Sequence, residues 1–156
     1  MHCHRVTRIL PYTPEQLFEL VGDVARYPEF VPWITSMRTG TVRSDVEGVS
    51  VVDAEAAVGF TFLKERFTTR VKRDANRHEI TVSLISGPFR KLRNLWVFHP
   101  DQAGCRVIFD IEFEFKSKLL DMLLAANFDR AVNKLIACFQ ARAETLYGPA
   151  EVAKAS

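Results

Sequence analysis

The segment from His2 to His4 places three potential metal ligands next to one another, with Cys3 between two histidines. Side chains alternate between the two faces of a strand, so Cys3 points away from both histidines if this segment is extended. The two remaining histidines, His78 and His99, fall in separate predicted strands, and no second ligand cluster accompanies them. We therefore expect no metal site.

Catalytic chemistry has few candidates in this sequence. No serine lies in a nucleophile-elbow context, and no glycine-rich phosphate loop occurs. Asp110, Glu112 and Glu114 alternate along a predicted strand, which places them together on its solvent face. Glu65 is the carboxylate that falls on an apolar strand face. We therefore expect that the protein is not an enzyme. If it were an enzyme, Glu65 would be its titrating group.

Basic side chains alternate along one predicted strand and line its face: Lys64, Arg66, Arg70 and Lys72. This face either contacts nucleic acid phosphates or is solvated and partly neutralised by Asp53 and Glu55 of the preceding strand. The net charge of +2 is too small to indicate a polyanionic partner by itself. The solvated face is the interpretation that we favour.

An aromatic segment, DVARYPEFVPWI at 23–34, combines two prolines with four large apolar residues: Tyr27, Phe30, Val31 and Trp33. The whole chain has twelve phenylalanines beside three tyrosines and two tryptophans. Phenylalanine is bulky and lacks a polar group, so such an interior is either very full or shaped around an apolar ligand. The segment is accordingly either a stiff lip at the mouth of a cavity or a plug at the end of the core.

The patterning also predicts the elements that must position these residues. Besides a strand and turn within 35–47, period-two alternation indicates strands at 2–10, 50–58, 63–72, 78–85, 91–98 and 105–115. Thr13 and Pro14 mark a helix start, and one more helical turn fits the proline-flanked segment that follows. From Ser117 to about Tyr147 no proline or glycine interrupts the helical period, which predicts one long helix.

The order of these elements predicts an α+β fold in a single domain over residues 1–148. A strand and two short helices precede the remaining strands, giving an antiparallel sheet of about six to seven strands before the long helix. A sheet with one apolar face must cover that face, and only the last helix is long enough to do so. We expect a curved sheet wrapped around the C-terminal helix, a hollow between them, and a disordered tail at 149–156.

Two polar residues are predicted among the inward-facing side chains. Glu65 falls on the apolar face of its strand, and Asn94 lies beside Trp96. A buried, unpaired carboxylate costs several kcal/mol, so such groups need partners. The partner is either a ligand's oxygen atoms, bound water or, for Glu65, an arginine at the sheet rim. The small residues Ala54 and Ala56 opposite large aromatics fit a filled core equally well.

The start of the last helix, SKLLDMLLAANF at 117–128, carries apolar residues on more than one face: Leu119, Leu120, Met122, Leu123 and Leu124. One side can pack inward, while the other must meet solvent, a second subunit or a lipid surface. We therefore expect Leu119, Leu120 and Leu123 to contact a membrane or a partner. A homodimer explains these exposed apolar residues as well as a lipid carrier does.

Three blocks of sequence resemble one known family. They are PYTPEQLFELVGDVARYPEFVPW at 11–33, GPFRKLRNLWVF at 87–98 and FEFKSKLL at 113–120, the last continuing to YG at 147–148. The chain is similar to the START-like (Bet v 1-like, helix-grip) superfamily, within its coenzyme Q-binding and ribosome-association-toxin family of the polyketide cyclase/dehydrase type. Members often carry a cysteine after the tryptophan, where this chain has Ile34, so no role of that thiol carries over.

The resemblance implies a cavity between the sheet and the C-terminal helix, with cavity or gate residues assigned by position: Tyr27, Phe30, Trp33, Phe89, Trp96 and Phe113. Our full set of candidate ligand-binding residues adds the remaining inward-facing ones, Val31, Glu65, Phe67, Asn94 and Phe128.

The resemblance implies three functions, in order of preference. The first is a non-enzymatic lipid chaperone that binds a polyprenyl quinone, ubiquinone, and supports respiration. The second is a toxin that binds the large ribosomal subunit and inhibits the association of ribosomal subunits. The third is an aromatic or polyketide cyclase.

Cysteine usage and hydropathy bear on location. The three cysteines, Cys3, Cys105 and Cys138, are widely spaced and fit a reducing compartment better than a disulfide framework. No window offers the roughly 18 uninterrupted apolar residues of a membrane span, and the N-terminal segment lacks the apolar core of a signal peptide. We expect a cytoplasmic protein, with peripheral contact at the inner membrane left open.

Overall fold

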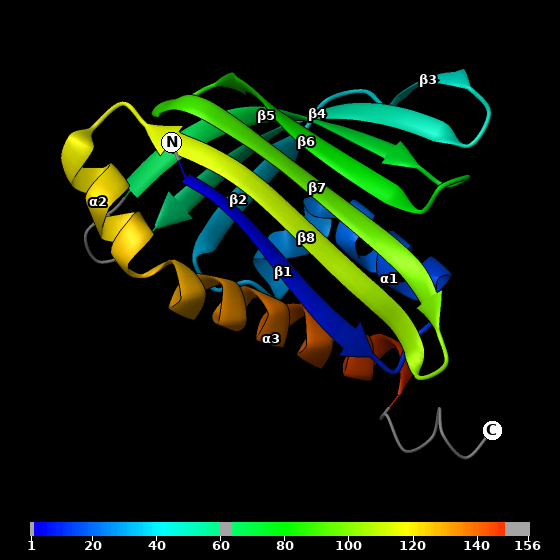
Figure 1. Ribbon diagram of the computed structural model, residues 1–156. Coiled ribbons are helices and arrows are strands. Elements are labelled where there is room, and N and C mark those ends of the chain that lie inside the picture. The colour runs from blue at the N-terminus through cyan, green and yellow to red at the C-terminus, as the bar shows by residue number, and fades with distance from the viewer. Residues whose placement is uncertain (1, 60–63, 149–156) are drawn as a thin grey trace.

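The computed structural model describes residues 2–59 and 64–148 (Figure 1). The chain begins with strand β1 (His2–Leu10), helix α1 (Pro14–Gly22) and the short 3₁₀ helix η1 (Val24–Glu29). Seven strands follow: β2 (Ile34–Thr39), β3 (Arg43–Val46), β4 (Val49–Gly59), β5 (Lys64–Asp74), β6 (Glu79–Ser86), β7 (Phe89–Asp101) and β8 (Gly104–Phe115). Helices α2 (Lys118–Ala126) and α3 (Phe128–Tyr147) complete the described chain.

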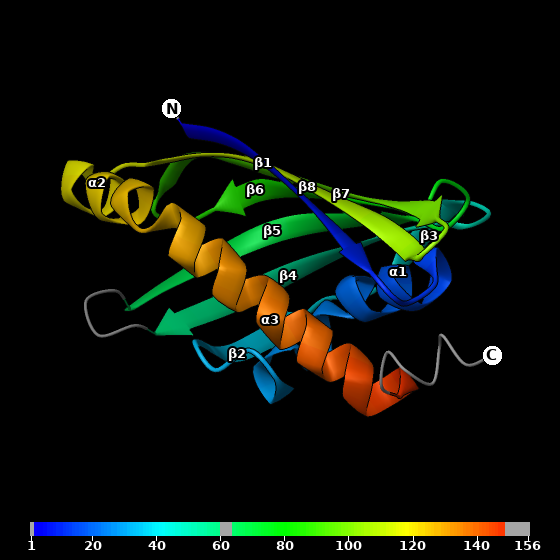
Figure 2. The same ribbon diagram turned by 60° about the horizontal axis from the view of Figure 1, so that its bottom comes forward.

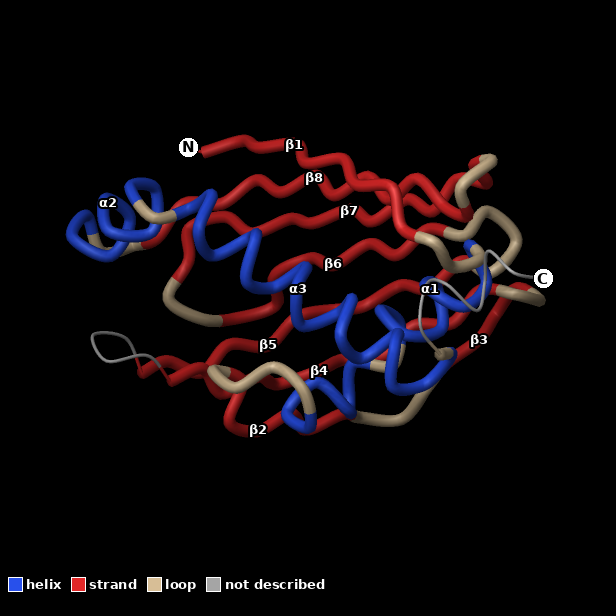
Figure 3. Tube along the Cα trace, turned by 90° about the horizontal axis from the view of Figure 1, so that it is seen from below, coloured by secondary structure: helices blue, strands red, loops and turns tan. Residues whose placement is uncertain are grey.

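The strands form one eight-stranded antiparallel sheet, ordered β1-β8-β7-β6-β5-β4-β2, with β3 paired to β4. Helix α3 lies across one face of this sheet (Figures 2 and 3). The predicted α+β helix-grip fold is therefore confirmed. The sheet has one strand more than expected, because the 35–47 segment forms two strands. All four residues of β3 are exposed. The sequence of this strand therefore has no alternation of apolar and polar residues that could predict it.

Local sequence explains how the first helix begins. The Thr13 hydroxyl accepts a hydrogen bond from the Gln16 backbone N–H, and the Gln16 side chain accepts one from the Thr13 N–H. This capping box, with Pro14 at the first helical position, satisfies N–H groups that the helix cannot pair internally. The apolar face of α1 is buried, and η1 supplies the predicted additional helical turn.

The inward faces of the strands agree with the predicted alternation. On β8 the side chains of Val107, Phe109, Phe113 and Phe115 are buried. On β4 the small residues Ala54 and Ala56 are buried, and on β5 Val71 is buried between exposed Arg70 and Lys72. These faces and the inner stripe of α3 form one hydrophobic core.

The prediction of a single helix from Ser117 to Tyr147 is wrong at one residue. Asn127 has φ −113° and ψ 14°, and it separates α2 from α3. Its side-chain amide donates to the Leu123 carbonyl at 2.8 Å, and its backbone N–H donates to the Leu124 carbonyl at 3.2 Å. These bonds cap the last turn of α2, and α3 then leaves across the sheet (Figure 2).

The helical period of the sequence predicts an inward stripe of Phe128, Val132, Leu135, Phe139 and Leu146, and the buried stripe of α3 differs slightly from it. The buried stripe consists of Phe128, Val132, Ile136, Phe139 and Ala143. Leu146, which the pattern placed inward, is 49% exposed. The disordered tail predicted at 149–156 lies outside the described residues, and so does Leu63, which strand alternation predicts to face inward.

Candidate functional site

The sheet and α3 enclose a layer of aromatic side chains, and one cluster in it involves the predicted lip. The ring of Phe139 on α3 lies 5.4 Å from Tyr27, 5.4 Å from Phe30 and 5.5 Å from Trp96, between ring centroids. All three arrangements are close to edge-to-face, which is a favoured geometry for aromatic pairs. We call Tyr27, Phe30, Trp96 and Phe139 the lip cluster.

Polar contacts fix the lip against the helices. The Tyr27 hydroxyl donates to the Val21 carbonyl of α1, and burial raises the pKa of this phenol. On α3, the Arg142 guanidinium lies 5.2 Å from the Phe30 ring centroid and pairs with the Glu29 carboxylate at 2.9 Å. Cation–π and charge-assisted contacts therefore hold η1 on α3.

The lip also includes Val31 and Trp33, which follow η1 directly. Val31 is completely buried, whereas the Trp33 side chain is half-buried. The Trp33 carbonyl accepts a hydrogen bond from the Gly59 N–H at 2.8 Å, which joins the lip to the end of β4.

A second aromatic cluster runs from β5 to the start of α3, and we call it the α2-end cluster. Phe67, half-buried on β5, lies 5.4 Å from Phe89, whose ring stacks on Phe115 at 4.4 Å. Phe113 stacks on Phe128 at 5.7 Å between centroids. Because these rings touch one another, a ligand in this layer must separate them.

His4 closes the second cluster, and the sequence analysis missed it because that histidine was considered only as a metal ligand. Its ring stacks on Phe128 at 3.8 Å between centroids. Alternation along β1 does place His2 and His4 on the same inward side, as expected, and Cys3 on the exposed side. The alternation of β1, which places His4 on the inward face of the strand, could have predicted that its ring packs against the helix.

The two inward polar residues have different surroundings. Asn94 is buried, and its side-chain amide donates to the Asp110 carbonyl at 2.9 Å, so the sheet satisfies part of its polarity. Glu65 is half-buried opposite Val58. Within residues 2–59 and 64–148, no hydrogen bond or ion pair of its carboxylate is found, including the arginine pairing left open above.

Helix α2 differs from every other helix of the site because none of its residues is buried. Leu120 and Leu124 pack partly against the core, and Leu123 is half-buried. Leu119 and Met122, by contrast, are 66% and 69% exposed.

One carboxylate anchors α2 to the sheet. The Asp121 carboxylate accepts from the Phe115 backbone N–H at 3.0 Å and lies 2.7 Å from the His2 ring nitrogen Nε2. The Phe115 N–H and, second, His2 hold the pKa of this carboxyl below its usual range. Strand β8 and the start of β1 thereby both attach to the first turn of α2.

Three hollows lined by described residues lie around the aromatic layer rather than within it. The largest, about 480 Å³, lies between the end of α1 and strands β3–β5, with the Arg73 side chain in its wall. One of about 380 Å³ lies over β1, β8 and β7. The third, of about 230 Å³, lies between α1, η1 and α3 beside Phe30 and Arg142. Of the predicted lining, Phe30 alone borders any of these three.

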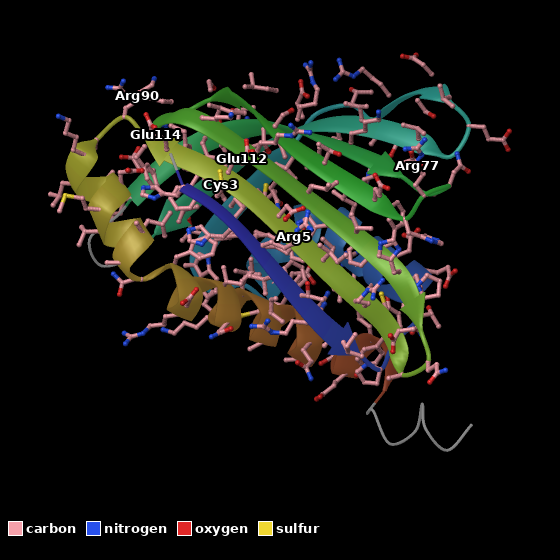
Figure 4. All side chains as sticks on the ribbon, viewed as in Figure 1. Cys3, Arg5, Arg77, Arg90, Glu112 and Glu114 are labelled. Atoms are coloured by element: carbon pink, nitrogen blue, oxygen red, sulfur yellow. The ribbon has the colours of Figure 1, made fainter. Side chains whose placement is uncertain are left out.

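The outer face of the sheet carries alternating charges in pairs. Asp53 pairs with Arg70 at 3.0 Å and Glu55 with Arg66 at 3.5 Å, so the expected neutralisation of the basic strand is confirmed. Arg70 lowers the pKa of the Asp53 carboxyl. The acidic residues of β8 are paired as well: Asp110 with Arg5, Glu112 with Lys91 and Glu114 with Arg90. Figure 4 labels Arg5, Arg90, Glu112 and Glu114 on this face. Among the described residues, Lys64 and Lys72 form no ion pair.

The described residues also bear on metal, membrane and thiol chemistry. In this part of the chain no group of three or more His, Cys, Asp or Glu side chains is arranged to hold a metal ion. No described helix has the length and hydropathy needed to cross a membrane. The three cysteines are free thiols, and burial raises the pKa of Cys105 to about 12.

Comparison with known proteins gives consistent results. Residues 10–140 match the family described as polyketide cyclase/dehydrase and lipid transport. The chain is 36% identical over 141 residues to the ribosome association toxin RatA of Rickettsia prowazekii, covering 88% of this chain and 93% of that protein. It is 32% identical over 151 residues to the mitochondrial coenzyme Q-binding protein COQ10 homolog B of Xenopus laevis, covering 94% of this chain and 59% of that protein.

A solved structure of higher identity is also similar. The solution structure of an 18 kDa protein from Caulobacter crescentus superimposes with a TM-score of 0.82 at 62% identity, covering 96% of this chain and all of that one. The sequence is therefore similar to proteins whose names refer either to the ribosome or to coenzyme Q, and the fold is shared with the Caulobacter crescentus protein.

Proposed function

Because the chain belongs to the polyketide cyclase/dehydrase and lipid transport family, we propose that it binds a polyprenyl quinone such as ubiquinone without transforming it. The observation that carries this proposal is the α2-end cluster. Its rings extend from half-buried Phe67 through Phe89 to Phe128, beside a helix with no buried residue. An apolar, flat headgroup is the chemistry that such a layer accepts.

The headgroup would intercalate between aromatic rings, with its oxygens near the inward polar groups. Glu65 has a carboxylate without a partner in the described chain, and it can accept a hydrogen bond from a quinol hydroxyl. Asn94 has one amide hydrogen committed to Asp110 and can offer the other to a quinone carbonyl. Trp96, Phe113 and Phe128, all buried, would form the floor.

The isoprenoid tail would leave the domain at the α2 end. Pockets for small molecules hold roughly 300–1,000 Å³, too little for a long polyprenyl chain inside a domain of this size. Leu119, Leu120 and Leu123 offer an apolar path from the aromatic layer to the surface. The protein would then work from the cytoplasm, with peripheral contact at the inner membrane.

Mass spectrometry of an organic extract of the purified protein tests this proposal. We expect near-stoichiometric quinone in the wild-type extract, and its loss in the Phe67→Ala/Phe89→Ala variant, which removes two adjacent rings of the α2-end cluster. Val42→Ala/Val46→Ala, at exposed positions beside and on β3, is the matched control and should retain quinone. Circular dichroism must show that each variant remains folded. An empty wild-type extract from quinone-containing cells would contradict the proposal.

A second candidate function is the inhibition of ribosomal subunit association through the large subunit. The specific observation in its favour is the similarity to RatA, which covers 93% of that protein, against 59% for the coenzyme Q-binding protein. The names of the similar proteins support this candidate better than they support quinone binding. The cations available for ribosomal RNA on the β5 face are Lys64 and Lys72, since Arg66 and Arg70 are paired with carboxylates.

Sucrose-gradient sedimentation at low salt separates the two candidates. Ribosome binding predicts that the protein sediments with the large subunit and that Lys64→Glu/Lys72→Glu abolishes this. Lys134→Glu, an exposed position on α3, is the control. A protein that stays at the top of the gradient rules the second candidate out. A third candidate, a cyclase-type enzyme, needs Glu65 as its titrating group, and unchanged activity of Glu65→Gln would exclude it.

A further inference from the structure

Helix α2 presents an apolar pair to solvent. Leu119 and Met122 lie three residues apart, so they are neighbours on one face of the helix. They are the two most exposed of the large hydrophobic side chains among the described residues, at 66% and 69%. An exposed apolar face on a protein whose other large apolar side chains are mostly buried is typical of a surface that contacts a partner or a lipid.

The pair cannot easily turn inward, because the opposite side of α2 is anchored. Asp121 accepts from the Phe115 N–H and contacts the His2 ring, while Leu120 and Leu124 pack against the core. Rotating α2 to bury Met122 would break both Asp121 contacts. The outward orientation of the pair is therefore built into the attachment of the helix.

The charges around the pair are mainly positive. Lys116 and Lys118 are exposed immediately before and at the start of α2, and its one acidic residue, Asp121, points to the sheet. At the same end of the molecule Arg90 lies beside Glu114, with which it pairs at 3.8 Å (Figure 4). Glu114 lies two residues before Lys116 but pairs with this arginine, and exposed Asp129 follows in the first turn of α3.

We propose that this α2 surface, defined as Lys116, Lys118, Leu119 and Met122, docks on a bilayer that contains anionic lipid. The two apolar side chains insert among the acyl chains near the headgroups, and the two lysines contact lipid phosphates. The inference rests on the proposed function and deepens it, since it names the surface through which a quinone with a long tail would be exchanged.

A bilayer explains this surface better than a second copy of the chain. A stable protein interface buries about 1,600 Å² in total, which two side chains cannot provide. In a two-fold symmetric dimer the same patch meets itself, so the lysines of one copy would face those of the other. An anionic bilayer has neither difficulty, because insertion needs only a small apolar patch when lysines add electrostatic attraction.

Co-sedimentation with vesicles tests the proposal. The wild-type protein is expected to bind vesicles of phosphatidylcholine mixed with phosphatidylglycerol, and to bind pure phosphatidylcholine weakly. Leu119→Gln/Met122→Gln should lower the partition coefficient about tenfold or more, as should Lys116→Glu/Lys118→Glu. Val42→Gln/Val46→Gln, which removes exposed apolar residues elsewhere, is the matched control and should bind like the wild type.

Three results would overturn it. These are no binding to the anionic vesicles, an equal loss in the Val42→Gln/Val46→Gln control, and a wild-type dimer in sedimentation equilibrium that Leu119→Gln/Met122→Gln converts to monomer. Failure here is distinguishable from failure of quinone binding. A protein that carries quinone in its extract but ignores vesicles would contradict only the docking surface.

Discussion

Helices α2 and α3 are consecutive in the chain and separated by a single residue, yet they have opposite relations to the core. Five residues of α3 are buried, from Phe128 to Ala143, and none of α2 is. Helix α3 lies across the sheet face, whereas α2 extends past the sheet end and contacts β8 (Figure 3). The comparison shows that the stability of the fold and its candidate contact surface lie on different helices, so they can be changed separately.

The largest expected effect on stability comes from removing a buried side chain of α3. Phe139 is 4% exposed and contacts three aromatic rings of the lip cluster and the sheet. Phe139→Ala should lower the free energy of unfolding by about 3–5 kcal/mol, because it removes buried apolar area and leaves a cavity. Urea denaturation followed by circular dichroism measures it. A loss below about 1 kcal/mol would mean that the layer is loosely packed.

A smaller effect is expected where the lip attaches to α3. Arg142→Gln removes the ion pair with Glu29 and the cation–π contact with Phe30, and we expect a loss of about 1–2 kcal/mol. Hydrogen exchange should accelerate in η1 while the centre of α3 stays protected. Arg26→Gln is the control, because the Arg26 side chain is 60% exposed and its ion pairs lie on the surface. Equal acceleration in both variants would show that Arg142 does not hold the lip.

The attachment of α2 should depend on pH. The folded-state pKa of Asp121 lies below its usual value, so the stabilisation is fully present above the unfolded pKa of about 3.9. It is lost as pH falls through the folded pKa. Asp121→Asn should therefore be less stable than the wild type at neutral pH, with the difference shrinking in acid. Urea denaturation at several pH values measures it, with Asp45→Asn, on exposed β3, as the control.

The smallest effect on stability is expected on the outward side of α2. Leu119→Gln/Met122→Gln should change the free energy of unfolding by no more than about 0.5 kcal/mol, since both side chains are mostly exposed. Thermal unfolding monitored by circular dichroism is sufficient for this measurement. A large loss would show that the pair packs against the fold, and the contrast between the two helices would then be wrong.

The contrast between α2 and α3 also separates what the sequence could predict from what it could not. Alternation correctly assigned the inward faces of β7 and β8 because buried residues there, such as Asn94, Trp96 and Phe113, alternate with neighbours that are more exposed. The break at Asn127 was missed, because asparagine is compatible with a helix and its capping bond to Leu123 is visible only in three dimensions. The exposed strand β3 was missed because it has no buried face.

For the candidate site, the sequence predicted which residues face inward but not which of them contact one another. The aromatic residues were identified by type and alternation, and the structure divides them between the lip cluster and the α2-end cluster. The contacts of Arg142 with Glu29 and of Asp121 with His2 join residues 113 and 119 positions apart. No local pattern reports such pairs, since they depend on how α3 crosses the sheet and on the pairing of β1 with β8.

Fluorescence titration of the purified protein with a short-tailed ubiquinone tests quinone binding most directly. The two tryptophans, half-buried Trp33 and buried Trp96, both belong to the candidate site, and quinones quench tryptophan at short range. We predict saturable quenching with one quinone per chain, and partial quenching in Trp33→Phe. Quenching that rises linearly without saturation, with the slope of free N-acetyltryptophanamide, would contradict a quinone site in this protein.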